Sequence, residues 1–325
     1  MGGGLGSGTC ENAVVRGVTY RAPLAGRGRI LVPSHVPRVP GGVGMHGACS
    51  KPGLAAAWAL QATTRLGVAP FSRRVAAPEL PPVDWDRWWK ENVSWAAPPD
   101  HWVIGLPADP RRRRFHILVL DESHRQVGFA KFSTNPLSEF AVRVREHLDR
   151  SDPSTFWTPR LLAHGSVSGW HFTVDSAMPE GFHRPALLTP ERRRAVLDEI
   201  RGILRQGLGF DVVHGDFGPW NIRSIKGHPV IVLDWEEASP GSAGMDELWH
   251  AVNVCLMGSL DVTGVEVAEH LDRVTLERVG EIARELLARL SGPEPPEVRP
   301  GSVLSSAGQR LHDAQRRVIR EFAEL

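Results

Sequence analysis

Two short polar segments, each placed directly after an apolar run, constrain this chain more than any other feature. The first is HGDFGPWN (214–221), which follows two valines and contains Asp216 and Asn221. Its Gly-Pro pair favours a sharp turn that brings these two side chains to one opening. The second is the acid Asp234, which ends the strand-like run PVIVLD. The pattern predicts a polar loop between strands, with a further carboxylate at the end of the next strand.

This set of oxygen atoms has a purpose in phosphoryl transfer. A carboxylate there accepts or orients the proton of the attacking hydroxyl, while an amide oxygen and another carboxylate hold magnesium against the nucleotide phosphates. Magnesium prefers oxygen ligands and retains several waters, so two protein ligands suffice. The alternative is a polar turn with no chemistry, which does not explain the ordered spacing of the two segments.

HGDFGPWN followed by VIVLDWEEA resembles the paired signature of the aminoglycoside phosphotransferase and choline kinase group, whose members are relatives of the protein kinases. The resemblance covers about residues 115–254 and is vague over 1–100. It implies an α+β, bilobal protein-kinase-like fold, with a small antiparallel-sheet lobe and a larger, mainly helical lobe. The implied activity is that of a small-molecule kinase, which uses ATP or another nucleoside triphosphate with Mg and phosphorylates an acceptor hydroxyl.

The resemblance also implies roles for the residues of the two segments. Asp216 corresponds to the catalytic base, and Asn221 and Asp234 correspond to the magnesium ligands. His214 is expected to buttress the loop rather than to transfer protons.

Four neighbouring residues are expected to support these segments. Trp220 and Trp235 are expected to pack beside the loop, because an aromatic side chain there more often fixes a shape than touches a substrate. Glu237 and Asp246 resemble positions that support the loop, although Glu237 fits a surface acid equally well.

Lys131 stands inside the apolar run GFAKF, in a chain that has only four lysines among 38 basic residues. A lysine in such a strand needs a reason, and a compact ammonium group that reaches the α and β phosphates supplies one. The alternative is a solvent-facing residue on a half-exposed strand. The resemblance implies that an acid on the following helix holds the lysine, and this acid is Glu146 or, alternatively, Glu139.

The segment VDSAMP (174–179) falls where the hinge between the lobes is expected. Backbone groups near Ser176 and Met178 would there meet the adenine edge. The chain departs from the family pattern in GLPADPRRRRF, which replaces a glycine-rich loop and offers Arg111 or Arg112 as a phosphate contact. A further departure is Arg223, which stands where an apolar residue is common.

Apolar periodicity predicts the remaining elements. Strands are expected at 115–121, 127–133, 159–165 and 170–179, and helices at 55–66, 137–148, 190–209, 271–290 and 304–325. We therefore expect an N-terminal extension (1–100), partly irregular and packing on the small lobe, then a small nucleotide-binding lobe (101–179) and a helical catalytic and substrate-binding lobe (180–325). The opening glycines, GGGLGSG, are expected to form a flexible terminus.

Composition excludes several classes of protein. The 325 residues carry a formal net charge of +1, which predicts no broad binding surface for nucleic acid or an anionic membrane. No apolar run approaches the roughly 20 residues of a membrane span, and the first residues lack the pattern of a signal peptide. Three widely spaced cysteines support neither a disulfide framework nor a zinc site. We expect a soluble protein of a reducing cytoplasm with a small-molecule partner, while the oligomeric state is left open.

Two further alternatives stay open at this point. A catalytically silent nucleotide-binding pseudokinase or scaffold would share the fold, although it would not need to keep Asp216, Asn221, Asp234 and Lys131. A cationic acceptor would favour a pocket rich in acids, for which Glu236, Glu237, Asp246 and Glu247 are available.

Overall fold

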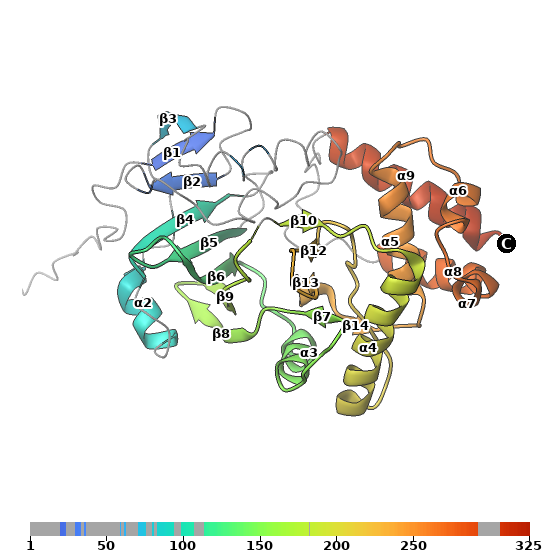
Figure 1. Ribbon diagram of the computed structural model, residues 1–325, viewed down its shortest axis with the longest axis horizontal. Coiled ribbons are helices and arrows are strands. Elements are labelled where there is room, and N and C mark those ends of the chain that lie inside the picture. The colour runs from blue at the N-terminus through green and yellow to red at the C-terminus, as the bar shows by residue number, and fades with distance from the viewer. Residues whose placement is uncertain are drawn as a thin grey trace, which may run out of the picture.

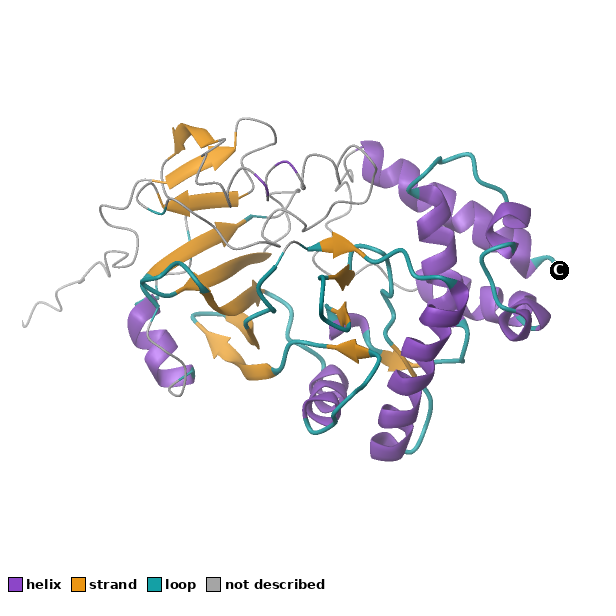
Figure 2. Ribbon diagram, viewed as in Figure 1, coloured by secondary structure: helices purple, strands orange, loops and turns teal. Residues whose placement is uncertain are grey.

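A computed structural model gives the arrangement of the chain in two lobes, with a large sheet in one and most of the helices in the other (Figures 1 and 2). The structure describes residues 20–23, 30–33, 36, 59, 62, 71–75, 80, 83–93, 99–106, 114–181, 183–291 and 306–325. The predicted helix at 55–66, the opening glycines and the two arginines Arg111 and Arg112 lie outside this set, apart from two isolated positions in the helix.

The small lobe is built on an eight-stranded sheet in the order β3-β1-β2-β4-β5-β6-β9-β8, in which all neighbouring strands are antiparallel. The strands are β1 (Tyr20–Pro23), β2 (Ile30–Pro33), β3 (Phe71–Val75), β4 (His101–Gly105), β5 (Arg114–Leu120), β6 (Gln126–Ser133), β8 (Leu161–Val167) and β9 (Trp170–Ser176). The small antiparallel-sheet lobe was therefore predicted correctly. Three strands from the first hundred residues extend this sheet at one edge.

A short helix, α2 (Trp85–Asn92), covers one face of this sheet. Asp84 caps its N-terminus by accepting a hydrogen bond from the backbone N–H of Arg87. The spacing of Trp85, Trp88 and Trp89 puts three indoles on one side of the helix, where they are buried against the phenylalanines of β5, β6 and β9. Helix α2 was not predicted from the sequence, although the Asp84 cap and the tryptophan spacing are its signal.

Helix α3 (Glu139–Asp149) follows β6 and begins at the cap residue Ser138. It lies near the junction of the lobes and contacts α4, β8 and the turn after Asp234. Its buried side chains are Ala141, Val144, Arg145 and Leu148. The buried face of this helix thus includes a cationic side chain, that of Arg145.

The long helix α4 (Pro190–Leu208) of the large lobe is capped by Thr189 and ends at Gly209, which has a left-handed φ of 85°. Short strands then carry the polar segments. A four-stranded sheet has the order β10-β12-β13-β7, and a two-stranded sheet joins β11 to β14. These strands are β7 (Phe156–Trp157), β10 (Arg184–Pro185), β11 (Val212–Val213), β12 (Ile222–Ser224), β13 (Val230–Val232) and β14 (Ser239–Pro240).

In the described part of the large lobe, the further helices are α5 (Met245–Leu256), α6 (Gly264–Ala268), α7 (Arg273–Glu277), α8 (Val279–Leu290) and α9 (Ser306–Ala323). The single helix expected at 271–290 is wrong, because the chain breaks between α7 and α8 at Arg278. Thr275 of α7 is buried and donates a hydrogen bond to Glu247 of α5, whereas α8 packs along α9 and α5. The break lets the two segments meet different partners.

Among the described residues, no helix is both long and apolar enough to cross a membrane. The amphipathic stripes of the large lobe instead pack against one another, as helices α5, α8 and α9 share one buried cluster.

The position of α2 leads to a test of the small-lobe core. We expect Trp85→Ala, which empties a site that is 1% exposed, to lower the free energy of unfolding by about 3–5 kcal/mol. Lys90→Ala is the matched control, because Lys90 lies on the exposed side of the same helix. Denaturant unfolding measures both, and a loss below about 1 kcal/mol for Trp85→Ala would show that α2 is not part of this core.

Candidate active site

The polar loop 214–221 is held by the carboxylate of Asp246, which lies in the first turn of α5. Its Oδ2 accepts a hydrogen bond from the backbone N–H of His214 at 2.7 Å, and its Oδ1 accepts one from Gly215 at 3.0 Å. Gly215 has a φ of 86°, and a Cβ there would overlap the carbonyl of Glu237. The expected supporting role of Asp246 agrees with these contacts.

The ring of His214 is fully buried, and both of its nitrogens are engaged. Nε2–H donates to the carbonyl oxygen of Leu233 at 2.8 Å, so Nδ1 is the acceptor for the backbone N–H of Asp216 at 3.2 Å. The ring also packs on Trp235, whose Nε1–H donates to Thr158. His214 therefore supports the loop and has no nitrogen left for proton transfer, and Trp235 is a packing residue.

Pairing of β12 with β13 brings the two polar segments together. Ile222 stands opposite Val232, and the backbone N–H of Leu233 donates to the carbonyl of Asn221 at 2.9 Å. Asn221, which comes just before β12, and Asp234, which comes just after β13, thus lie at the same end of this pair of strands. Asp234 has a left-handed backbone with φ 66° and ψ 66°, an uncommon conformation for a residue other than glycine that is often found at functional sites.

The carboxylate of Asp216 accepts three side-chain hydrogen bonds from neutral donors. Trp249 Nε1–H reaches Oδ1 at 3.0 Å, while Trp220 Nε1–H and Asn221 Nδ2–H reach Oδ2 at 3.0 and 2.8 Å. Burial raises the pKa of Asp216 above its usual range, and the two indole N–H groups oppose that shift. A carboxylate offers about four acceptor positions, so about one remains here for a further donor.

Trp220 was predicted as a packing residue, and this is incomplete, because its indole N–H orients Asp216. Gly218 makes room for that indole, since a Cβ at Gly218 would lie 2.5 Å from Trp220 Cε2. Trp249 was not predicted from the sequence, in which its signal is its place one helical turn after Asp246 on α5.

Lys131 reaches from β6 of the small lobe into this group. Its Nζ lies 2.6 Å from Asp234 Oδ1 and 2.9 Å from Glu236 Oε1. Burial disfavours the charged lysine, yet these carboxylates outweigh it and hold the pKa of Lys131 above its usual range. Burial raises the pKa of Asp234, but Lys131 more than reverses this and lowers it to about 2. Both partners are charged at neutral pH.

The predicted pairing of Lys131 with Glu146, or alternatively Glu139, is wrong. Glu146 lies on the outer side of α3, with its nearest ion-pair partner Arg150 at 3.4 Å, and Glu139 is exposed in the first turn of that helix. The inward position belongs to Arg145, whose Nη2 lies 2.6 Å from Asp175 Oδ1 of β9 and donates to the carbonyl of Pro159.

The expected hinge residues follow the last strand of the small lobe. Ser176 ends β9; its backbone N–H donates to the carbonyl of Arg160 at 2.9 Å, and its Oγ accepts from the N–H of Arg160 at 3.0 Å. Met178 is half-buried just beyond it. Their contact with adenine stays a prediction.

Arg223, noted as a departure from the family pattern, is buried under the loop. Its Nη1 donates to the carbonyl oxygen of Pro219 at 3.4 Å. A long polar side chain at this position therefore supports the Gly-Pro turn from below, which an apolar residue would not do.

The donor set around Asn221 and Asp234 fits a hard divalent cation. Asn221 uses its Nδ2 on Asp216, which leaves Oδ1 as its ligand atom, and Asp234 is ionised. Within the described part of the chain, no group of three or more His, Cys, Asp or Glu side chains forms a metal cage. An oxygen pair of this kind suits magnesium that keeps waters and substrate oxygens, rather than zinc.

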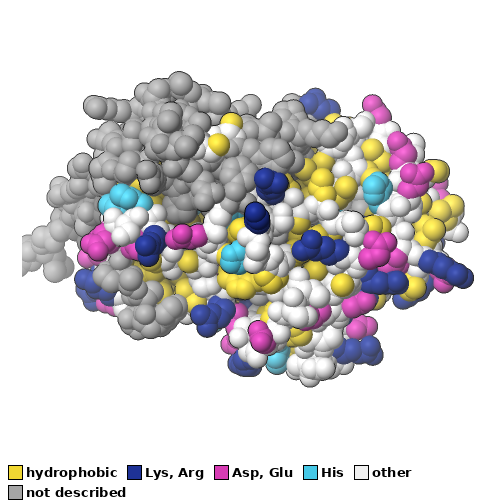
Figure 3. Space-filling view, viewed as in Figure 1, with side chains coloured by type: hydrophobic (Ala, Val, Ile, Leu, Met, Phe, Trp, Pro, Cys, Tyr) yellow, Lys and Arg dark blue, Asp and Glu magenta, His cyan; other side chains and the backbone are white. Residues whose placement is uncertain are grey.

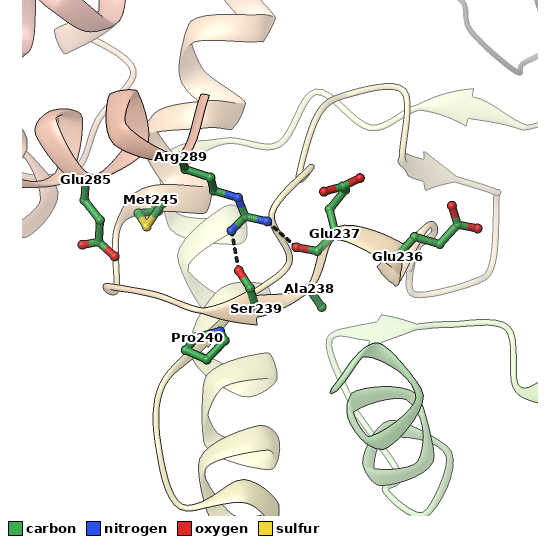
Figure 4. Close-up of a pocket in the computed structure, with 8 residues that line it drawn as sticks. All are labelled: Glu236, Glu237, Ala238, Ser239, Pro240, Met245, Glu285 and Arg289. Carbon is green, nitrogen blue, oxygen red and sulfur yellow. Dashed lines mark hydrogen bonds between the residues drawn. The ribbon is translucent and has the colours of Figure 1, made fainter. Parts of the chain in front are cut away.

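A pocket of about 410 Å³ lies beside the segment that follows Asp234 (Figure 4). Glu236 and Glu237 line it from that segment, and Glu285 and Arg289 line it from α8. Arg289 donates to Ser239 Oγ and to the carbonyl oxygen of Glu237, so its guanidinium ties α8 to this segment. Of the four acids available for an acceptor pocket, Asp246 and Glu247 are buried in α5, where they accept hydrogen bonds from the loop backbone and from Thr275.

The described surface in Figure 3 shows acidic and basic side chains interspersed over one face of the molecule. This distribution agrees with the formal net charge of +1.

No family model and no curated protein matches the sequence. Two crystal structures of a thermostable mutant of aminoglycoside phosphotransferase APH(4)-Ia are similar to this chain. The apo form is 12% identical, with 74% of this chain and 100% of that chain covered and a TM-score of 0.44. The ternary complex with ADP and hygromycin B is 11% identical, with 74% and 99% covered and a TM-score of 0.44.

The bifunctional kinase-methyltransferase WbdD is 14% identical, with 70% of this chain and 47% of that chain covered and a TM-score of 0.26. Identities and TM-scores of this size carry no functional argument, so the roles of the site residues rest on the geometry of the site.

The anchoring of the loop by Asp246 leads to a stability test. Asp246→Ala leaves two backbone N–H groups without their acceptor, and each costs about 1–3 kcal/mol when buried. We expect a drop of that order in the free energy of unfolding, read from chemical denaturation. The exposed Asp261→Ala is the control, and equal stability of the two variants would contradict the anchor.

The Lys131–Asp234 contact leads to a test by pH. Because the folded pKa of Asp234, about 2, lies below its ordinary value of 3.8, the stabilisation is present above about pH 4 and is lost as the pH falls toward 2. In Lys131→Met, the largest influence that lowers the pKa of Asp234 is removed while burial still raises it, so this pKa rises well above its value in the wild-type protein. Carboxyl carbon NMR titration measures both proteins, and an unchanged pKa in the variant would refute the contact.

Proposed function

We propose that this chain is a small-molecule kinase that transfers the γ-phosphoryl group of ATP, or of another nucleoside triphosphate, to an acceptor hydroxyl. The observation that carries the proposal is a convergence of charges between the lobes. Lys131 of the small lobe meets Asp234 of the large lobe across 103 positions of sequence, beside the loop that holds Asp216 and Asn221. Phosphoryl transfer needs this combination of a cation, a metal-binding oxygen pair and a carboxylate facing the acceptor.

On the donor side, Asn221 Oδ1 and Asp234 would hold magnesium, which neutralises phosphate charge when it is bound. Lys131 would release part of its contact with Asp234 and bind phosphate oxygens with the ammonium protons so freed. Backbone groups near Ser176 and Met178 would meet the adenine edge. Lys131 lies on β6, and Asn221 and Asp234 flank β12 and β13, which supports catalysis chiefly by positioning and electrostatics.

On the acceptor side, Asp216 would receive the hydroxyl at the position that its three donors leave open. Trp249 and Asn221 hold the carboxylate in place, and Trp220 closes its other side. The carboxylate therefore accepts one incoming O–H group in a fixed direction. This geometry favours orientation of the acceptor oxygen toward phosphorus, with proton transfer to Asp216 as the bond forms.

A nucleotide-binding protein without turnover is the second candidate. The observation that favours it is the occupancy of the two acids, since Asp216 already holds three hydrogen bonds and Asp234 is paired with Lys131. Stabilisation by Mg·ATP without phosphate transfer to any hydroxyl acceptor would select this candidate.

The kinase proposal is tested with a panel of hydroxyl acceptors and ATP consumption as the readout. For an accepted substrate, we expect Asp216→Asn to lower kcat by about 10²–10⁴-fold, because the variant cannot accept the proton. Binding of Mg·ADP is expected to persist, since Asp216 does not hold the nucleotide.

The control for this experiment is Asp198→Asn, an exposed acid on α4 whose ion pair with Arg201 stays within that helix. Turnover that survives Asp216→Asn at the level of this control would contradict the role of Asp216. Thermal unfolding of both variants distinguishes a loss of chemistry from a loss of fold.

A further inference from the structure

We propose that Glu236 is the positioning residue for Lys131, and that it takes the place of an acid on helix α3. This inference rests on the proposed kinase function and assigns a role to a residue that the sequence analysis considered only as an acid of the acceptor pocket. It places both anchors of the lysine in the large lobe.

Helix α3 does not supply the acid that holds Lys131. Its buried, inward-facing side chains include Arg145 and no acid. Arg145 is itself paired with Asp175 at 2.6 Å. The two acids of this helix that the sequence suggested, Glu139 and Glu146, both lie on its outer side. The third acid of the helix, Asp149, accepts a hydrogen bond from the backbone N–H of Leu161 at 3.0 Å. Helix α3 thus presents a cation toward the sheet, and its three acids lie apart from the ion-pair contacts of Lys131.

The ammonium group of Lys131 faces two carboxylates. An ammonium group has three protons, and two of them face Asp234 at 2.6 Å and Glu236 at 2.9 Å. The left-handed backbone of Asp234 and the short helical turn Trp235–Glu237 bring these two carboxylates onto the same side. The side chains are 25% exposed for Lys131 and 40% exposed for each acid, so solvent screens the pair only in part.

Asp234 is the carboxylate for which two cations compete. Magnesium and Lys131 both need oxygens of this carboxylate, and a cation that binds there weakens the lysine contact. Glu236 is not one of the proposed metal ligands, so it holds Lys131 while Asp234 serves the metal. Without Glu236, Asp234 is the one of the two anchors that remains for Lys131. The lysine then competes more strongly with magnesium for the oxygens of Asp234.

The test compares Glu236→Gln with Glu146→Gln, which neutralises the acid that Lys131 does not contact. Calorimetric titration with Mg·ADP measures binding without turnover. We expect Glu236→Gln to weaken binding roughly fivefold to tenfold, as for loss of one partly exposed charge-assisted hydrogen bond. At a fixed ADP concentration, the Mg²⁺ concentration that gives half-maximal binding should rise by a similar factor. Glu146→Gln should bind as the wild-type protein does, and Glu236→Asp should restore part of the lost binding.

A double-mutant cycle with Lys131→Met separates an effect through the lysine from a direct one. In the Lys131→Met background, we expect Glu236→Gln to change Mg·ADP binding by less than about twofold. A full additional loss there would overturn the inference, because Glu236 would then act independently of Lys131. Equal binding by Glu236→Gln and Glu146→Gln would overturn it as well.

Failure of the proposed function has a different signature in the same experiment. A wild-type protein that binds no Mg·ADP would overturn both the kinase proposal and the role of Glu236. A wild-type protein that binds Mg·ADP, with additive losses in the cycle, would overturn the role of Glu236 alone. Thermal unfolding of each variant confirms that the fold is retained.

Discussion

The ion pair of Lys131 with Asp234 and Glu236 is the interaction on which the arrangement of the site depends. It joins a strand of the small-lobe sheet to the segment that follows β13 in the large lobe. Partly buried charges of this kind are tolerated only as a set, because removal of one member leaves the others without compensation. The ion pair therefore links the two lobes beside the polar loop.

The large lobe supplies a rigid support for the other half of the site. Helix α5 carries both Asp246, which binds the backbone of the loop, and Trp249, which binds the carboxylate of Asp216. Most of the side chains of this helix are buried, so it has little freedom to move. The same helix thus orients both the loop and its acid.

The small lobe departs from the expected arrangement in one important respect. Arg145 turns inward from α3 and pairs with Asp175, so this helix is tied to β9 rather than to Lys131. The lysine then finds its second carboxylate in Glu236 of the large lobe. As a result, the ammonium group of Lys131 is held by two carboxylates of the large lobe, and a shift of α3 alone does not remove these contacts.

The sequence by itself determined the strand that carries Lys131 and the loop that carries Asp216 and Asn221, because spacing and apolar periodicity are local properties. The two-lobed α+β architecture was implied by the resemblance of the two polar segments to a known family. The sequence-based prediction missed helix α2 and joined α7 to α8. Only the tertiary structure decided which acids meet Lys131 and which donors surround Asp216. From the sequence alone, either Glu146 or Glu236 could pair with Lys131. Which of them does so depends on the face of α3 that is buried and on the turn after Asp234. Contacts between residues far apart in sequence come from packing, which no local pattern encodes.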